Sequence, residues 1–139
     1  TENDLVDIFL IREKLECMAA SLAAKRCTEA QLAELKEALE FQEFYLSKQD
    51  AEHIKLMDNK FHRTLYKLTG SMTFFDTLVP LHKKIQKYRR ASVESKSRAT
   101  ASAEEHRKIF EAIAEGNSEK AEEFAKAHVE NAYKHIKKG

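Results

Sequence analysis

The stretch Asp58-Asn59-Lys60-Phe61-His62 places a carboxylate and an imidazole four residues apart, in a segment whose apolar residues recur at helical spacing. On a helix, side chains with this spacing lie on one face, one turn apart. Phe61 and Leu65 lie beside them, so we expect this face to point into the protein rather than into water. A buried charge without a partner is energetically costly. The stretch therefore predicts polar partners on other helices.

The composition of the chain indicates a helical protein. Its 139 residues include only three glycines and one proline, and Ala, Leu, Glu and Lys dominate. The formal net charge is +1, from 24 basic and 23 acidic residues, so the chain as a whole lacks the basic excess typical of nucleic-acid binding. Neither a membrane-spanning apolar run nor a secretory signal is present, which predicts a cytoplasmic protein with no membrane partner. The length fits one domain, residues 1–139.

Apolar spacing and capping residues predict an all-α fold, an antiparallel bundle of about six helices with an internal metal or ligand pocket. Thr28 and Gln31 form a capping box, Asp50 is an N-cap, and Gly70 occupies a C′ position. Ser102-Ala103-Glu104-Glu105 resembles a second capping box, and Pro80 predicts a kink. The predicted helices cover residues 4–27, 28–47, 50–69, 71–94, 102–116 and 117–136, with a loop or frayed helix end over 91–101.

Several other features have ordinary structural interpretations. Cys17 and Cys27 lie too far apart on one helix to form a disulfide, so we expect reduced cysteines. Residues 82–90 are basic and include an aromatic residue, a combination that can contact phosphates. Such a stretch is more often a solvated helix face, and this is what we expect here. His53, His82 and His135 have no matched partner in the pattern and are predicted to lie at the surface.

His106 and His128 are predicted to meet across a helical hairpin. Each lies eleven residues from the turn at Asn117. At a rise of 1.5 Å per residue, both lie about 16 Å from that turn, level with each other. His106 is also three residues from Ile109, and His128 lies between Ala125 and Ala132, so both face inward. Two level imidazoles are half of a metal site.

Asp58 and His62 can supply the other half of such a site. Three histidines and one aspartate suit a divalent transition metal such as Zn²⁺, Ni²⁺ or Mn²⁺. In the alternative interpretation, each histidine is satisfied separately in the core. The spacing by itself leaves open whether the helix of Asp58 packs against the hairpin.

The motifs, taken in order, resemble those of one known family. They comprise Phe9-Leu10-Ile11-Arg12-Glu13-Lys14-Leu15-Glu16, Asp58-Asn59-Lys60-Phe61-His62, Arg98 and Ser102, Glu105-His106, Ile109, Ala112-Ile113, Gly116-Asn117, Ala121 and His128. In this order they resemble the FCD (FadR C-terminal) domain, which senses ligands in GntR-type bacterial transcription regulators. The resemblance covers nearly the whole chain, although the family usually has Asp at the position of Asn117.

This resemblance implies a function and a set of site residues. It implies that Asp58, His62, His106 and His128 bind one metal, and that a small organic acid binds beside it. Arg12 matches an arginine of the family that contacts the effector, and Arg98 and Asn131 are further candidates. The resemblance also implies a homodimer, with operator DNA bound by an N-terminal winged-helix domain that we do not find within these residues.

Two other functions remain as alternatives. A metal-dependent hydrolase would use an open metal position to activate water. It would also need a general base, and Glu105 is predicted to point about 100° away from His106 on its helix. A plain interaction bundle without a metal is the third hypothesis.

Overall fold

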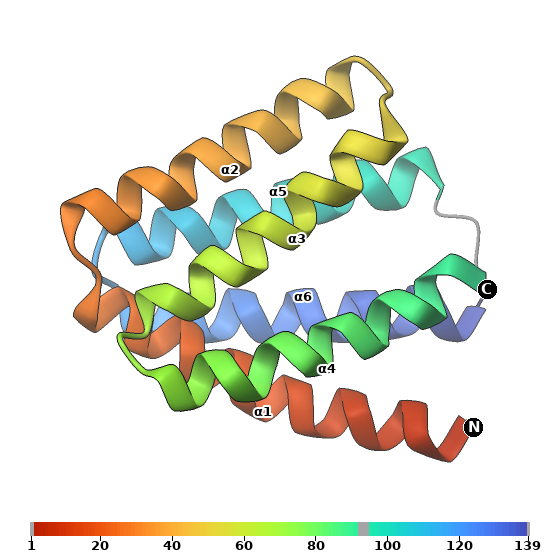
Figure 1. Cartoon of the computed structure of the whole chain (residues 1–139), viewed down its shortest axis with the longest axis horizontal. Coiled ribbons are helices and arrows are strands. Elements are labelled where there is room, and N and C mark those ends of the chain that lie inside the picture. Colours follow the sequence, from red (N-terminus) through yellow and green to blue (C-terminus); the bar gives the residue numbers. More distant parts are fainter. Residues whose placement is uncertain (1, 92–94, 139) are drawn as a thin grey trace.

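Six helices make up the computed structural model of the chain (Figure 1), which describes residues 2–91 and 95–138. Their bounds are α1 (Glu2–Arg26), α2 (Glu29–Ser47), α3 (Ala51–Leu68), α4 (Met72–Ala91), α5 (Lys96–Ala114) and α6 (Ser118–Lys138). No strand occurs within the described ranges. The all-α fold predicted from composition and spacing is confirmed.

The helix ends follow the capping chemistry of the sequence. The Thr28 side chain accepts from the Gln31 backbone N–H, while the Gln31 side chain accepts from the Thr28 backbone N–H, which completes the predicted capping box. Asp50 caps α3 through its bond from the backbone N–H of His53. Gly70 follows α3 with a φ of 69°, the left-handed conformation that glycine adopts without strain. These short caps allow successive helices to run antiparallel.

The fifth helix begins earlier than predicted. Its N-cap is Ser95, whose hydroxyl accepts from the backbone N–H of Arg98. Ser102 is buried inside α5, so the capping box predicted at this residue is wrong. Residues 96–101 are small or polar but contain no glycine or proline, and helix can extend through them. The predicted end of the preceding helix, Glu94, lies outside the described residues, and Pro80 lies inside α4.

Side chains of α3, α4, α5 and α6 meet in one interior. α1 packs along α6 and also contacts α3, α4 and α5, whereas α2 contacts α3 and α5. α4 packs against α1 and α3. Figure 1 shows the two chain ends at the same end of the bundle. Because α3, α4, α5 and α6 all border this interior, side chains distant in sequence can meet there.

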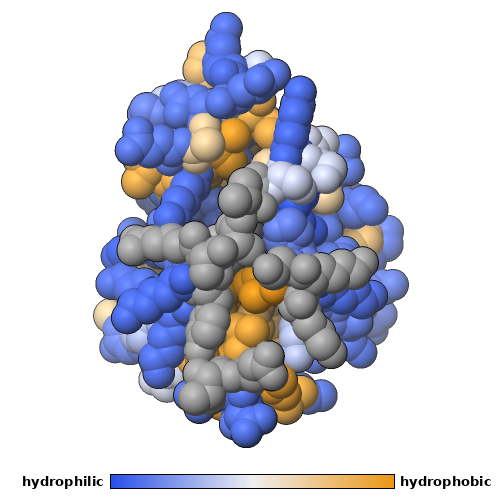
Figure 2. All heavy atoms as spheres, turned by 90° about the vertical axis from the view of Figure 1, so that its right-hand side faces the viewer, coloured by the Kyte–Doolittle hydropathy of each residue, from blue (hydrophilic) through white to orange (hydrophobic). Residues whose placement is uncertain are grey.

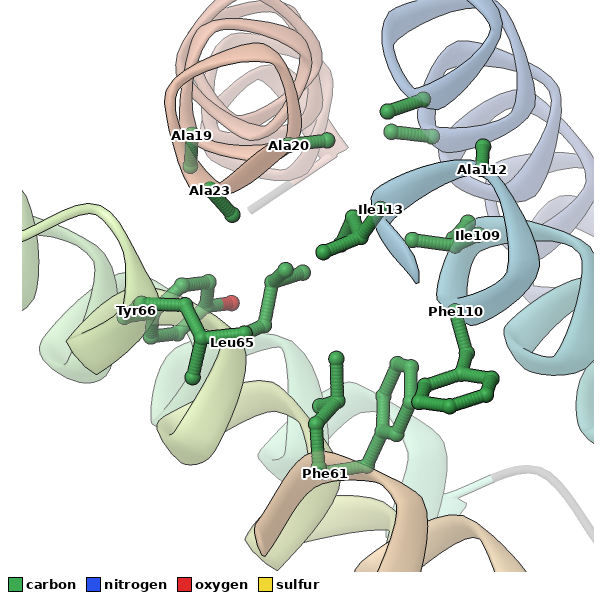
Figure 3. Close-up of a cluster of buried hydrophobic side chains, with 14 of the residues drawn as sticks. Ala19, Ala20, Ala23, Phe61, Leu65, Tyr66, Ile109, Phe110, Ala112 and Ile113 are labelled. Carbon is green, nitrogen blue, oxygen red and sulfur yellow. The ribbon is translucent and has the colours of Figure 1, made fainter. Parts of the chain in front are cut away.

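One part of the interior is a dense apolar core. Small residues on α1 (Ala19, Ala20 and Ala23) allow that helix to approach Leu65 of α3 and Ile113 of α5 closely (Figure 3). All of these side chains are buried. Close packing of this kind fixes the relative register of α1, α3 and α5. The positions of polar residues on α3 and α5 are fixed by the same register.

The surface is mostly hydrophilic. Figure 2 shows the end of the bundle where both chain ends lie, with hydrophilic residues over most of it and hydrophobic residues in smaller areas. The outer side of α1 exposes Leu10, Ile11 and Met18, each at least half accessible to solvent. Within the described residues, no helix combines the length and the apolar character needed to cross a bilayer.

Candidate metal and effector site

Asp58, His62, His106 and His128 lie together inside the bundle, and all four side chains are buried. α3 contributes Asp58 and His62, α5 contributes His106, and α6 contributes His128. The side chains of Phe61 and His106 stack with ring centres 4.2 Å apart, which packs α3 against α5 at this level. The structure therefore settles the question that spacing left open, because the helix of Asp58 does pack against the hairpin.

The potential ligand atoms converge on one point. The Nε2 atoms of His106 and His128 are 3.3 Å apart. Asp58 Oδ1 lies 3.5 Å from His106 Nε2 and 3.6 Å from His62 Nε2. Donor atoms bound to one ion at about 2.1 Å lie about 3.0 Å apart in an octahedral arrangement and about 3.4 Å apart in a tetrahedral one. The observed separations thus match those around a single metal ion.

The Nδ1 atoms of His106 and His128, on the ring side away from the other ligand atoms, each bind a side-chain oxygen. His106 Nδ1 donates to Gln42 Oε1 at 2.8 Å, and His128 Nδ1 donates to Glu105 Oε1 at 2.7 Å. A neutral imidazole carries only one N–H, so these bonds leave a lone pair on each Nε2. The two Nε2 atoms then face each other beside a carboxylate oxygen. An oxygen acceptor on the far ring nitrogen is the usual outer-shell arrangement of metal-ligating histidines.

Burial keeps the imidazoles of His62 and His128 neutral. The pKa of His128 lies well below its ordinary value, first because the ring is buried and then because of nearby charges on His106 and Arg12. The pKa of His62 is also lowered well below its ordinary value, mainly by burial, although Asp58 opposes this shift. Neutral imidazole is the form that binds metals. The donor set therefore fits a divalent transition metal, as its residue types suggest.

His82 is not a surface residue, and this prediction is wrong. Its side chain is buried on α4, and its ring centre lies 4.4 Å from that of His62. The neighbouring Ile85 is buried too, so residues 82–90 are not simply a solvated face; the side chains of 88–90 lie outside the described residues. His53 and His135 are both partly exposed, and the His53 side chain, which is 46% accessible to solvent, pairs with Asp50.

Arg12 is buried beside the cluster rather than exposed. Its Nε donates to Glu16 Oε1 at 3.4 Å, and the Tyr66 hydroxyl donates to the same oxygen. The positive charge of Arg12 helps to lower the pKa of both His62 and His128, which places it within electrostatic reach of the histidine cluster. Burial, together with the charge of Glu16, raises the pKa of Tyr66 well above its ordinary value, so this hydroxyl stays protonated.

Arg98 and Asn131 both bind Glu105. Arg98 donates to the two carboxylate oxygens at 2.9 and 3.1 Å, and Asn131 Nδ2 donates at 2.9 Å. Since His128 uses the same carboxylate, Glu105 connects the start of α5 to α6. Glu105 does not face the donor atoms but supports His128 from outside. A cavity of about 190 Å³ is lined in part by Glu105, Lys108 and Asn131.

Three residues of this site, Gln42, His82 and Glu105, were not predicted from the sequence, and simple spacing signals indicate two of them. Gln42 continues the buried positions Leu35, Ala38 and Leu39 of α2 at intervals of three or four residues. His82 similarly lies four residues after Leu78 and three before Ile85. Glu105 gives no such signal, because its contact to His128 depends on how α5 and α6 pack.

Comparisons with known proteins agree with this architecture. Residues 7–131 match the FCD domain family. The HTH-type transcriptional regulator YdhC of Bacillus subtilis (strain 168) is 30% identical over 139 residues, which cover 99% of this chain and 62% of that protein. The HTH-type transcriptional repressor RspR of Escherichia coli (strain K12) is 24% identical over 120 residues, covering 86% of this chain and 53% of the relative.

Two solved structures share the fold. Streptococcus agalactiae GntR superimposes with a TM-score of 0.82 at 29% sequence identity, over 96% of this chain and 60% of that one. E. coli McbR/YncC superimposes with a TM-score of 0.86 at 20% identity, over 99% of this chain and 70% of that one, and shows similarity of fold alone.

The chain therefore belongs to the FCD domain family, the effector-binding domain of GntR-type transcription regulators. It is a regulator domain and not an enzyme of the hydrolase class considered above. It spans 62% and 53% of the lengths of the two regulators that it resembles in sequence.

Proposed function

We propose that this chain is the effector-sensing and dimerising domain of a GntR-type transcription regulator, and that it binds a divalent metal together with a small organic acid. Asp58, His62, His106 and His128 are the proposed metal ligands. Zn²⁺, Ni²⁺ and Mn²⁺ all suit this mixed nitrogen and oxygen set. The 139 residues form one domain in this proposal, and operator DNA is bound by a separate N-terminal domain.

The observation that carries the proposal is the pair of facing imidazoles. Both Nδ1 atoms bind side-chain oxygens, and the two Nε2 atoms lie 3.3 Å apart with Asp58 Oδ1 beside them. Neutral imidazole nitrogens and a carboxylate oxygen at these separations are donor atoms that suit one divalent ion. An ion that accepts more than four ligands would also offer its remaining coordination positions to a carboxylate oxygen of the effector.

Arg12 is the proposed second anchor for the acid. Its guanidinium is buried near the histidine cluster, where a charge-assisted bond to a carboxylate is strong. Glu16 accepts from Arg12 and also from the Tyr66 hydroxyl, so the guanidinium is positioned before any ligand arrives. Arg98 and Asn131 remain candidates for effector contact, and an acid that reached them would compete with Glu105 for their N–H groups.

The regulatory step follows from the number of helices that meet at this site. An acid held between α1 and the residues of α3, α5 and α6 favours one arrangement of these helices over others. In a homodimer, that arrangement sets the spacing of the two DNA-binding domains. The exposed apolar side of α1, with Leu10, Ile11 and Met18, supports the proposal of a dimer.

The proposal is tested by thermal unfolding of untagged protein with a panel of small carboxylic acids, each in the presence and absence of metal. We expect at least one acid to raise the unfolding temperature, and to do so much more in the metal-loaded protein. If no acid stabilises either form, this account of the site fails.

A matched pair of arginine variants sharpens the test. R12K keeps the positive charge but loses the planar fork that binds a carboxylate through two N–H groups, so we expect weaker stabilisation by the acid. R107K is the control, because Arg107 pairs with Glu43 at the surface, away from the cluster. Equal responses of the two variants would remove Arg12 from the effector site.

A further inference from the structure

His82 is directed into the bundle by the spacing of its own helix. Leu78 precedes it by four residues and Ile85 follows it by three, and both are completely buried. Side chains at these intervals share one face of a helix. α4 turns this face toward α3, with which it is in contact. The His82 ring consequently lies inside the protein, although its neighbours Lys83 and Lys84 are exposed.

Two overlapping sets of ligand atoms meet at His62 among the described residues. One set consists of His62, His106 and His128, and the other of Asp58, His62 and His82. Within each set, one ligand atom per residue lies within 4.8 Å of the others. The second set brings in α4, which contributes none of the four ligands proposed above.

The spacing of the ring centres is compatible with imidazoles that share one ion. A ring bound through a nitrogen at about 2.1 Å has its centre about 3.2 Å from the metal, so two such rings at a right angle have centres about 4.5 Å apart. The His62 and His82 ring centres are 4.4 Å apart. The pairs His62–His106 and His106–His128 have closely similar spacings, 4.9 and 4.6 Å.

We propose that His82 is a fifth protein ligand of the metal, in addition to Asp58, His62, His106 and His128. The proposal rests on the function proposed above, since it concerns the same ion. Five protein donors exceed the four of a tetrahedral zinc site and suit an ion that accepts six ligands. A single coordination position then remains, so the organic acid binds the metal through one carboxylate oxygen. The ion also joins α4 to α3, α5 and α6.

The number of bound imidazoles can be counted in the protein loaded with Co²⁺. Each imidazole bound to this paramagnetic ion keeps one ring N–H, whose proton resonance is strongly shifted and disappears in heavy water. The probe is the untagged chain with one equivalent of Co²⁺, and the readout is the number of shifted, exchangeable proton signals. We expect four such signals.

The variant H82F replaces the imidazole by a ring of similar shape that cannot bind a metal. We expect it to show three signals and to bind Co²⁺ more than about tenfold more weakly, since even loss of an outer-shell partner costs about 10–100-fold in metal affinity. H53F is the matched control, because His53 lies at the surface, stacked on Tyr45, and we expect it to keep four signals.

The possible outcomes separate this inference from the function on which it rests. Three signals in both the parent and H82F would overturn the assignment of His82 while leaving the three-histidine, one-aspartate site intact. If the parent shows no shifted signals, both the assignment of His82 and the proposed metal site are overturned. If H82F does not fold, the number of signals in the parent still decides, because His62, His106 and His128 account for only three.

Discussion

Two buried regions of the same bundle have opposite character. In one, Ala19 and Ala23 of α1 pack with Leu65 and Ile113 in a cluster of buried hydrophobic side chains (Figure 3). In the other, one or two turns away on α3 and α5, the interior is made of a carboxylate and imidazoles. Burial of the apolar surface stabilises the folded state. Burial of the polar groups costs hydration, and only bonds to partner groups compensate for that cost.

The comparison shows how one region positions the other. On α3, Asp58 and His62 precede the buried Leu65 and Leu68, and on α5, His106 precedes Ile109. The apolar contacts fix the register of these helices, and the register brings Nε2 of His106 to within 3.5 Å of Asp58 Oδ1. Stability therefore resides mainly in the apolar region and ligand binding in the polar one. The predictions below test that division.

The largest effect is expected from a cavity in the apolar region. Leu65→Ala removes a buried side chain and should reduce the free energy of unfolding by about 2–5 kcal/mol. Chemical denaturation of the metal-free protein measures this loss. The control is Leu56→Ala on the same helix, where the side chain is half exposed and little change is expected. A loss of metal affinity in folded Leu65→Ala, with stability unchanged, would reverse the proposed division.

The polar region should respond to pH. His62 and His128 have a pKa well below the ordinary value in the folded protein, whereas in the unfolded chain they titrate near pH 6.5. The unfolded state therefore binds more protons as the pH falls below about 6.5, and the folded state loses stability. The expected loss is about 1.4 kcal/mol per pH unit for each histidine.

Denaturation of the metal-free protein between pH 7.5 and 5.5 measures this loss. The variant Leu65→Ala should show the same slope from a lower starting value, because its change lies in the other region. A free energy of unfolding that stays constant over this range would mean that the two imidazoles are not held neutral by burial.

A smaller effect is expected from the carboxylate that supports His128. Glu105→Gln keeps the shape of the side chain but replaces the charged acceptor of the His128 N–H. We expect metal affinity to fall by about 10–100-fold, as for loss of other outer-shell partners. Titration of the metal-free variant measures the change, with Glu104→Gln, at an exposed neighbouring position, as the control. Equal affinities in the two variants would show that Glu105 does not support the site.

The sequence was sufficient for those parts of the molecule that depend on local spacing. The interval of four residues between Asp58 and His62 predicts that they share a face. Counting residues from the turn at Asn117 predicts that His106 and His128 lie level, and their Nε2 atoms are 3.3 Å apart. Helix caps such as Thr28 and Asp50 were likewise predicted from residues within one turn.

The parts that the sequence did not reveal depend on how helices pack. His82 was assigned to the surface because no matched partner for it was evident, although Leu78 and Ile85 lie on the same helix face and are buried. The start of α5 was misplaced because Ser102 has the chemistry of a cap, while the true cap, Ser95, lies beyond six small or polar residues. The link from Glu105 to His128 follows from the packing of α5 on α6, which no spacing within one helix encodes.

Calorimetric titration of the metal-free, untagged protein with Zn²⁺, Ni²⁺ and Mn²⁺ tests the central claim most directly. We predict that at least one of these ions binds with a stoichiometry of one per chain, and that His106→Leu abolishes this binding while His53→Leu leaves it unchanged. Absence of binding by the parent, or equal binding by His106→Leu, would contradict the claim that Asp58 and the buried histidines hold a common ion.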